Sequence, residues 1–596
     1  MIGRENMKAQ EIFIVTIAGI ASAYVLRKVF IRLQLSVAKH PSLRGHSKWS
    51  RRIAKILPFF EYDKAEYFST DGAPEHIANK RYEGLLRLQS AVKSQCKKTL
   101  ACSESLENSI SDVRFTSQYR VPFPYRTHLP KEFKLGSIIE ESQGTKIKDM
   151  DGNWRHDLSG SYGVNVFGYD FYKKCMANGF EKVSKLGPVL GSYHPLIEDN
   201  VTQIKRISGL DEVSFHMSGT EAVMQAVRLA RYHTGKTHLV RLCGAYHGWW
   251  DGVQPGVGNK RKVNDVYTLN DLSQKTLTVL NSRSDIACVL INPMQAFHPN
   301  GDTSSDATLI ASERSTHFDK EKYTKWLEGI REICSSRNIV LIFDEVFTGF
   351  RLSYRGAQGY FNIQADMVTY GKTLGGGLPV GVLAGKHELM KRFKDNHPAN
   401  VSFARGTFNS HPHVMACMNE FLNEIKKPDF QKQYIQQENI WNQRTALFNQ
   451  RLKEADIPVQ INNMHSVLSI LFTQPCRYNW MLQFYIRNNG LELSWIGTGR
   501  MIMSFNFSDQ EFDEVIHNFI QACLQMKKDG WWWNHNYISN KRIKRQFLYD
   551  LLTSNFPILK HALTSPLNII KINTSSNING NHSQQITNSN IMKKAG

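Results

Sequence analysis

The chain has 596 residues, of which 41% are hydrophobic and 11% aromatic, a composition typical of folded globular proteins with several domains. The formal net charge is +21, but the excess is concentrated toward the two ends and lies beside no recognisable nucleic-acid-binding module, so we expect no nucleic-acid partner. Nine cysteines are scattered without a Cys-x-x-Cys spacing, which argues against a metal site or a disulfide framework and favours a reducing compartment.

An apolar run near the N-terminus is the first feature along the chain. Residues 12–26 carry no charge over 15 positions, whereas a membrane-spanning helix typically needs about 20 apolar residues. Basic residues gather on the carboxyl side of the run, the reverse of a cleaved signal peptide. We therefore expect residues 1–56 to be an uncleaved single anchor with a basic segment, which keeps the chain on the cytoplasmic face of a membrane. A helix in the membrane interface, and a buried helix of a plainly cytoplasmic protein, are the alternatives.

The next stretches lead into the region with chemical motifs. Residues 57–129 read as a helical extension, with a helix-like stretch over 74–98, and no function is assigned to it. Residues 148–154 contain an Asp-Gly pair and predict a β-hairpin. Beyond it, residues 159–163 are small and turn-prone, so they could bend close to a ligand.

A strand, a turn and a helix then follow one another. The alternating strand 213–217 precedes Ser218, Gly219 and Thr220, and a helical segment begins at Glu221. Free N–H groups and two hydroxyls at a helix N-terminus make a ready phosphate site. The alternative is an ordinary Ser/Thr helix cap.

Three later segments place polar or aromatic groups after predicted strands or beside glycine. Strand 238–243 ends shortly before Tyr246 and His247, and an aromatic side chain there could lie over a cofactor ring or pack in the core. Strand 286–291 is followed by Gln295, whose amide could bond a phenolic oxygen. Thr407 offers a further hydroxyl beside a glycine.

A carboxylate, Asp344, and an amine, Lys372, follow two later predicted strands. The apolar segment 339–343 ends at Asp344, and the segment 366–370 is followed by Lys372, at strand ends where ligands of α/β sheets bind. A phosphate-binding P-loop ending at Lys372 is excluded, because the glycine which that motif needs is Asp366. A carboxylate and an amine so placed are the minimum equipment of a pyridoxal phosphate enzyme.

Together these segments resemble the class III aminotransferases of the fold type I pyridoxal phosphate enzymes. The resemblance covers roughly residues 130–525 and rests on the motifs at residues 218–222, 246–248, 344–351, 370–372 and 375–381. Within the class the chain is most similar to glutamate-1-semialdehyde 2,1-aminomutase and to the aminotransferase modules of polyketide and peptide synthases. Residues 244–252, 292–295 and 406–412 look closer to the synthase modules.

The resemblance implies a role for each of these residues toward pyridoxal 5'-phosphate. Lys372 would hold the cofactor as a Schiff base and act as the catalytic base, and Asp344 would pair with the pyridinium nitrogen. Tyr246 would stack on the ring and Gln295 would reach the ring oxygen. The phosphate would be bound by Gly219 and Thr220 with help from Thr407 of the second subunit of a homodimer, and the cofactor-binding set is completed by Ser218 and His247.

The resemblance also implies a fold and a division into domains. We expect an α/β protein of fold type I, with a large domain around a mostly parallel seven-stranded sheet and a smaller α+β domain. The expected large domain is 176–390, and the small domain joins 130–175 to 391–528. Residues 529–596 are expected to be a basic and aromatic appendage, followed by a disordered Asn/Ser-rich tail. The appendage is either a simple helical extension, which we favour, or a segment that contacts a membrane surface or a partner.

The expected function is amino-group transfer from a small-molecule donor to an aldehyde or ketone acceptor through the Schiff base at Lys372. The alternatives are a glutamate-1-semialdehyde aminomutase, an isomerase that keeps the amino group within one substrate, and a catalytically inactive membrane-tethered scaffold. Asn292-Pro293-Met294 stands where the family commonly has Glu-Pro-Val, so this chain lacks that glutamate. Ala296-Phe297-His298 replaces the glycine-rich continuation usual in many ω-aminotransferases, which argues for a different substrate pocket. Arg351 and Arg405 are candidates for binding a substrate carboxylate or for structural ion pairs.

Overall fold

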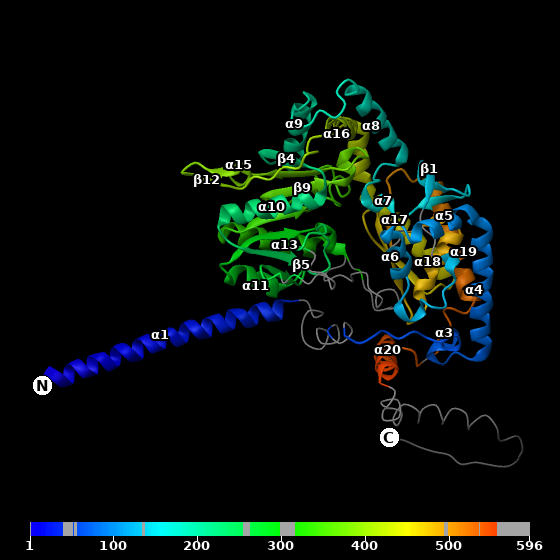
Figure 1. The fold of residues 1–596 in the computed structure, drawn as a ribbon, viewed down its shortest axis with the longest axis horizontal. Helices are drawn as coiled ribbons and strands as arrows, with labels where there is room; N and C mark the ends of the chain where they lie inside the picture. The colour runs from blue at the N-terminus through cyan, green and yellow to red at the C-terminus, as the bar shows by residue number, and fades with distance from the viewer. Residues whose placement is uncertain are drawn as a thin grey trace, which may run out of the picture.

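The computed structural model describes residues 2–39, 52, 56–133, 138–253, 261, 263–297, 316, 318–493, 499–535 and 537–556. These residues form two domains side by side, from which the long N-terminal helix α1 (Ile2–Ala38) projects (Figure 1).

A seven-stranded sheet forms the centre of the large domain, as predicted. Its strands are β4 (Glu212–His216), β10 (Gly381–Gly385), β9 (Met367–Gly371), β8 (Val340–Asp344), β7 (Ile286–Ile291), β5 (His238–Leu242) and β6 (Val266–Leu269), in that order. Only β10 runs antiparallel to its neighbours. Every residue of β7, β8, β9 and β10 is buried, because helices cover both faces of the sheet.

The two faces of this sheet belong to two different cores. Along β8, Val340 and Ile342 pack on one face with α10 (Gly219–Thr234), whereas Leu341 and Phe343 pack on the other. The second face is covered by α9 (Leu196–Ser208), α11 (Gln274–Ser282), α13 (Lys320–Ser336) and α16 (Pro412–Ile425). The remaining helices of this domain are α8 (Tyr169–Lys182), α14 (Gly356–Phe361) and α15 (His387–Met390), and a β-ribbon pairs β11 (Phe393–Lys394) with β12 (His397–Val401).

The described part of the small domain contains two sheets with helices packed beside them. One sheet has the order β1 (Ile139–Gln143), β2 (Lys146–Asp149), β3 (Trp154–Asp157) and β15 (Leu491–Glu492), and the predicted hairpin is its β2–β3 pair. The other sheet has the order β13 (Val459–Met464), β14 (Val467–Phe472) and β16 (Arg500–Ile502). Its helices are α17 (Pro428–Glu454), α18 (Leu482–Asn488) and α19 (Asp509–Lys528).

The helical extension packs into the core of the small domain. It consists of α3 (Lys64–Ser69), α4 (Glu75–Gln95), α5 (Lys97–Glu107) and α6 (Ser111–Tyr119). Leu85 and Leu88 of α4 share one apolar cluster with Trp441 of α17 and Phe512 of α19. The extension and the small domain therefore form one folded unit.

The prediction of an appendage beginning at residue 529 is wrong for its tryptophans. Trp531 and Trp532 are buried in the same cluster, where their indole nitrogens donate to the hydroxyl of Tyr485 at 2.8 Å and to Oδ1 of Asn479 at 3.0 Å. Helix α20 (Asn540–Asn555) follows, and its Ile543 and Leu551 are buried there too. The local sequence suggested an exposed aromatic run because the groups that bury it lie far away in the chain. The predicted Asn/Ser-rich tail from residue 573 lies outside the described residues.

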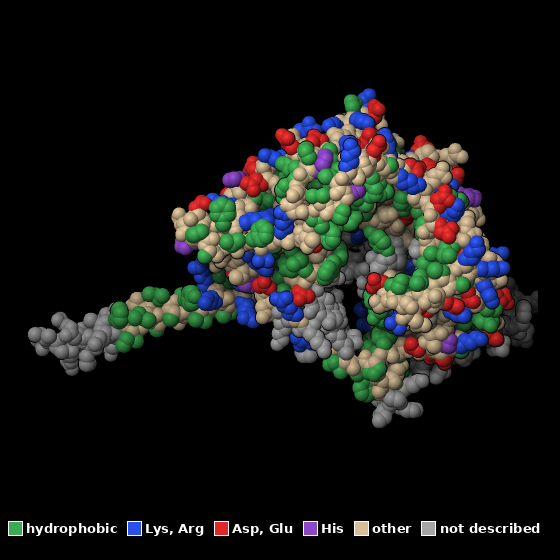
Figure 2. Space-filling view, turned by 45° about the horizontal axis from the view of Figure 1, so that its top comes forward, with side chains coloured by type: hydrophobic (Ala, Val, Ile, Leu, Met, Phe, Trp, Pro, Cys, Tyr) green, Lys and Arg blue, Asp and Glu red, His purple; other side chains and the backbone are tan. Residues whose placement is uncertain are grey.

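Helix α1 is long and apolar enough to cross a membrane between Phe13 and Ala38, and none of that segment's most apolar window is buried in the protein. Figure 2 shows hydrophobic side chains along its shaft and Lys and Arg side chains where it meets the large domain. It is attached there through Ala38, whose carbonyl accepts from the Asn270 amide at 3.0 Å, and through a bridge from Lys39 to Leu269.

Candidate active site

The carboxyl ends of two neighbouring strands place an acid and an amine close together. Asp344 is the last residue of β8, and Lys372 directly follows β9, which runs parallel to β8 with Thr369 opposite Asp344. The Oδ1 atom of Asp344 accepts from the Val346 amide at 3.1 Å and from the Thr369 hydroxyl at 3.3 Å. These bonds fix the carboxylate before any ligand binds.

His247 contacts the other oxygen of this carboxylate. Its Nδ1 lies 2.7 Å from Oδ2 of Asp344, and both side chains are almost fully buried. The Nε2 atom of His247 is buried without a hydrogen-bond partner among the described residues. A buried polar atom left unpaired is costly, so this nitrogen marks a place where a ligand or water would be stabilised.

Lys372 lies beside this pair with an unusual backbone and an unusual pKa. Its φ is 48°, in the left-handed region, and its Nζ donates to the Tyr162 carbonyl at 2.6 Å. Burial of the amine lowers the pKa of Lys372 from its usual 10.5 to about 8; the charge of Asp344 opposes this shift, and the weaker effects of Arg351 and Arg500 add to it. A lysine with this pKa has a substantial neutral fraction near neutral pH, as a nucleophile or base requires.

The carbonyl that holds Lys372 belongs to a strained turn. Gly160, Ser161, Tyr162 and Gly163 have φ values of 53°, 45°, 58° and 92°, and such conformations cost about 1–2 kcal/mol for each non-glycine residue. Asp157 stabilises the turn, because its carboxylate accepts from the amides of Ser159 at 2.8 Å and Ser161 at 3.3 Å. The sequence therefore indicated this turn, because residues 159–163 were predicted to bend close to a ligand.

The start of helix α10 has the features expected of a phosphate site. The Ser218 hydroxyl accepts from the Glu221 amide at 3.3 Å, so it acts as the helix cap that the alternative interpretation described. The amides of Gly219 and Thr220 lie in the first helical turn, where no carbonyl of the same helix can accept from them. A Cβ at Gly219 would lie 2.7 Å from Val346, and one at Gly381 would collide with the Ser218 carbonyl. Two glycines therefore let this helix start approach the ends of the strands.

The other predicted residues differ in exposure. Tyr246 is 62% exposed, which excludes the alternative of core packing, and burial of part of its ring with the charge of Asp344 raises its pKa. Gln295 is buried and its amide nitrogen donates to the Cys243 carbonyl at 2.6 Å. Thr407 is exposed in the loop after β12.

Sequence analysis did not identify Phe347 or Arg500 as site residues. For Arg351 it left two possible roles, binding of a substrate carboxylate or a structural ion pair. The Nζ of Lys372 lies 4.9 Å from the centre of the Phe347 ring. Arg351 is fully buried and donates to the Ser466 hydroxyl and the Met503 carbonyl, both at 2.7 Å, so these acceptors are neutral and Arg351 forms no ion pair with the described residues. Arg405 is exposed, with its guanidinium 5.6 Å from the centre of the Tyr193 ring.

This donor set fits pyridoxal phosphate. An amine of lowered pKa, a fixed carboxylate, an exposed tyrosine and a helix start cleared by glycine surround the same strand ends, and each corresponds to one chemical part of that cofactor. Within the described residues, no three His, Cys, Asp or Glu side chains gather as a metal site. Fold and site together define a fold type I pyridoxal phosphate enzyme.

Comparison with known proteins identifies the family. The family model described as "Aminotransferase class-III" matches residues 130–523. Glutamate-1-semialdehyde 2,1-aminomutase of Citrifermentans bemidjiense is 30% identical over 363 residues, which cover 58% of this chain and 78% of the relative. Among solved structures, a glutamate-1-semialdehyde aminomutase from Pseudomonas aeruginosa PAO1 has a TM-score of 0.60 at 16% identity and covers 75% of this chain and 99% of its own. The β-phenylalanine aminotransferase of Variovorax paradoxus has a TM-score of 0.57 at 19% identity over 74% of this chain and 96% of its own.

The chain belongs to the class III aminotransferase family. It is an enzyme of pyridoxal 5'-phosphate-dependent amino-group transfer, and the predicted fold, family and cofactor are confirmed. The match begins at residue 130, so the helices of residues 57–129 lie outside the shared region.

Proposed function

We propose that this enzyme transfers an amino group from a small-molecule donor to an aldehyde or ketone, with Lys372 as the residue that holds the cofactor and moves the proton. The observation that supports this assignment is the amine of Lys372, with its pKa lowered to about 8, beside the fixed carboxylate of Asp344. Pyridoxal phosphate, when bound, supplies an aldehyde that takes up the amino group and a ring that withdraws electrons.

The residues around Lys372 have complementary roles in this proposal. Asp344 would stabilise a protonated ring nitrogen, and the hydrogen bond to His247 at 2.7 Å orients that carboxylate. Gly219 and Thr220 would bind the phosphate at the positive end of helix α10. Tyr246 is exposed and would cover one face of the ring.

The test replaces Lys372 and follows the cofactor. Purified wild-type protein incubated with pyridoxal phosphate should show a protein-bound absorbance band that changes on addition of an amino donor. Lys372→Ala should lose both the band and turnover, by a factor of about 10³ or more. The matched control Lys432→Ala, an exposed lysine on α17, should behave like wild type. Turnover retained in Lys372→Ala would contradict the assignment.

The aminomutase alternative is favoured by the relative from C. bemidjiense, which carries that name and is covered over 78% of its length. Product analysis separates the two reactions. An aminomutase needs no external amino donor and releases no keto acid. The proposed transferase needs an external amino donor and releases a keto acid. Conversion of a single amino-aldehyde without a donor would favour the aminomutase.

We further propose a homodimer in which the second subunit supplies Thr407. Large aromatic side chains near this threonine and near the strand ends are exposed in the single chain, namely Tyr246, Trp249, Phe403 and Phe408. Exposed aromatic residues of this size commonly mark protein interfaces. Sedimentation should give a dimer mass that Phe408→Asp shifts toward monomer, and a monomeric wild type with full activity would contradict the proposal.

Helix α1 supports membrane attachment, and we propose that it anchors the enzyme. Phe13, Ile14 and Val15 are consecutive and all exposed, so apolar side chains surround the helix and no polar face exists there for an interfacial position. Residues 12–26 rise about 22 Å, and Arg27 and Lys28 can extend to the headgroups beyond them. The protein should remain in the membrane pellet after an alkaline carbonate wash, and release by that wash would exclude the anchor.

A further inference from the structure

Helix α1 leaves the large domain close to the point where its apolar run ends. Residues 13–30 are all exposed, and the first partly buried side chain is that of Ile31, from where α1 packs along α11 and ends beside β6. The rise from Leu26 to Ile31 is about 7 Å, which is comparable to one headgroup layer of about 5–8 Å. An anchor of residues 12–26 therefore brings this side of the domain to the membrane surface.

The β-ribbon of the large domain extends toward the same side as α1 (Figure 1). Phe393 of β11 pairs with Val401 of β12, and every residue of the two strands is exposed. The exposed fraction is 51% for Phe393 and 55% for Val401. A two-stranded ribbon by itself is only marginally stable in water, and an exposed apolar pair on it marks a place that another surface covers.

The base of the ribbon is fixed to the large domain far from the cofactor residues. The Tyr232 hydroxyl, near the end of α10, donates to the Asn400 carbonyl at 2.6 Å, and the Arg392 guanidinium donates to the Ser214 hydroxyl at 2.6 Å. Thr220 lies at the start of α10, about 18 Å along the helix from Tyr232. The ribbon is therefore remote from the proposed phosphate site, where the second subunit would supply its threonine.

Basic side chains surround the apolar pair. The Lys391 ammonium lies 5.0 Å from the centre of the Phe393 ring and also pairs with Asp395. Lys394 and His397 pair across the ribbon and are both exposed. Figure 2 shows further Lys and Arg side chains where α1 meets the domain. Basic groups beside exposed apolar ones are the combination that binds anionic lipid surfaces.

We propose that this side of the large domain is a membrane-binding surface, in which Phe393 and Val401 enter the interface of an anionic bilayer and Lys391 and Lys394 lie among its phosphates. The proposal rests on the anchoring role proposed for α1 and extends it from one helix to the catalytic domain. The active site, at the other end of α10, then faces away from the bilayer. Its substrate therefore reaches Lys372 from the aqueous side.

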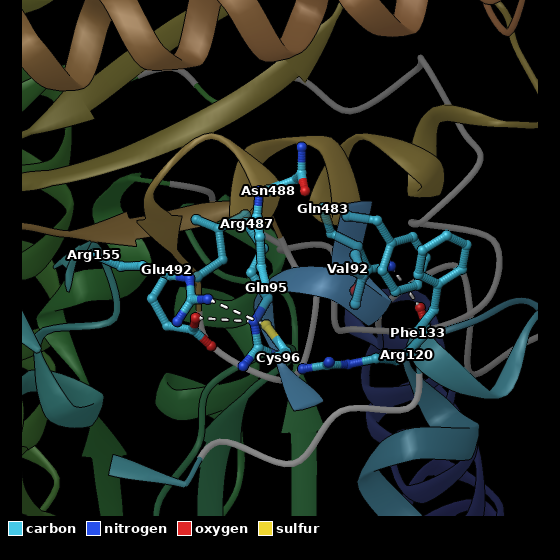
Figure 3. Close-up of a pocket in the computed structure, with 12 residues that line it drawn as sticks. Val92, Gln95, Cys96, Arg120, Phe133, Arg155, Gln483, Arg487, Asn488 and Glu492 are labelled. Carbon is cyan, nitrogen blue, oxygen red and sulfur yellow. Dashed lines mark hydrogen bonds and ion pairs between the residues drawn. The ribbon is translucent and has the colours of Figure 1, made fainter. Parts of the chain in front are cut away.

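The experiment measures amide hydrogen exchange of the full chain on vesicles of equal parts phosphatidylcholine and phosphatidylserine, and in a neutral detergent. Exchange of residues 391–402 should be about fivefold or more slower on the vesicles, because the bilayer excludes water from the ribbon. Vesicles of phosphatidylcholine alone should give a smaller effect, since the lysines then lack anionic lipids. The internal control is α18, which borders the pocket between the extension and the small domain (Figure 3) and should exchange alike in all three.

A pair of variants tests the apolar contact itself. Val401→Ser should lose most of the slowing on vesicles, because it removes half of the exposed apolar pair. Comparing vesicles with detergent for each variant cancels any change in the ribbon's own stability. The matched control Ile435→Ser, at an exposed aliphatic residue of α17, should keep the wild-type slowing. Slowing that persists unchanged in Val401→Ser would exclude the contact.

Three other results would overturn the proposal. Equal protection of residues 391–402 in detergent and on vesicles would mean that a second copy of the chain covers the ribbon. Equally fast exchange in both, in protein that resists the carbonate wash, would mean that α1 alone binds the membrane. Release by the carbonate wash would remove the anchor and this surface together. Amino-group transfer, measured in detergent, is independent of all three results.

Discussion

At the scale of single residues, the charge around Lys372 is set by groups from distant parts of the chain. Asp344 and His247 are 97 positions apart and 2.7 Å from one another. Arg351 and Arg500 lie on other elements and lower the pKa of Lys372, while Asp344 raises it. The amine is therefore a nucleophile at neutral pH because burial and two positive charges outweigh one negative charge.

The first prediction concerns the pH dependence of cofactor attachment. The rate at which cofactor-free enzyme takes up pyridoxal phosphate should rise with pH around a midpoint near 8, and not near 10.5, because only the neutral amine of Lys372 reacts. Arg500→Gln should move the midpoint upward, since it removes a charge that lowers this pKa. Stopped-flow absorbance at several pH values measures both.

The same lowered pKa has a consequence for stability. Between about pH 8 and 10.5 the folded state binds fewer protons at Lys372 than the unfolded state, so the free energy of unfolding of cofactor-free protein should rise with pH across this window. Arg451→Gln, which removes an exposed ion pair with Asp513, is the control for both measurements. It should leave the pH midpoint of cofactor uptake unchanged. If the pH midpoint of cofactor uptake by wild type lay above 10, the claim that burial lowers the pKa of Lys372 would be contradicted.

At the scale of elements, the turn of residues 160–163 joins β3 to the active site. Its left-handed backbone aims the Tyr162 carbonyl at Lys372, and Gly163 is needed where the Phe347 ring approaches. Strain of this kind persists only where surrounding contacts hold it, here the bonds to Asp157.

The second prediction follows from this close approach. Gly163→Ala should lower the free energy of unfolding by about 1–3 kcal/mol and reduce turnover, because its Cβ would collide with the Phe347 ring and φ is 92°. Chemical denaturation and steady-state kinetics measure the two effects.

Gly187→Ala is the matched control for this change. Its φ is 57°, so it shares the backbone strain, but its Cβ would meet nothing within 4 Å. We expect a smaller loss of stability and unchanged turnover. Equal effects of the two substitutions on turnover would mean that the Phe347 contact has no role.

At the scale of the whole molecule, the extension, the small domain and the C-terminal segment share one core. Arg81 of α4 is buried and donates to the carbonyls of Gly530 at 2.9 Å and Phe68 at 2.7 Å. Its guanidinium also lies 4.5 Å from the centre of the Tyr478 ring. One side chain therefore connects three segments that are remote in sequence.

The third prediction tests this connection. Arg81→Met should lower the free energy of unfolding by about 2–4 kcal/mol, because two buried carbonyls lose their donor. Lys80→Met, the exposed neighbour on α4, should change it by less than about 0.5 kcal/mol. If the extension were an independent unit, the small domain's unfolding transition would not move in Arg81→Met.

Local pattern accounts for much of the fold and of the site. The strands ending at Asp344 and Lys372 were predictable because a run of buried β-branched and aromatic residues signals a parallel strand, and parallel strands bring their carboxyl ends to one edge. The start of a helix at Gly219 was also predictable, because helix caps depend on residues that are adjacent in the sequence.

Tertiary packing decided the rest. The burial of Trp531 and Trp532 and the pairing of His247 with Asp344 each join segments that no short pattern relates. The sequence by itself therefore determined the family, the cofactor and the order of the strand-end residues, because those depend on neighbours along the chain. Only the tertiary structure decided the pKa of Lys372 and the place of the extension, because burial and charge act through space.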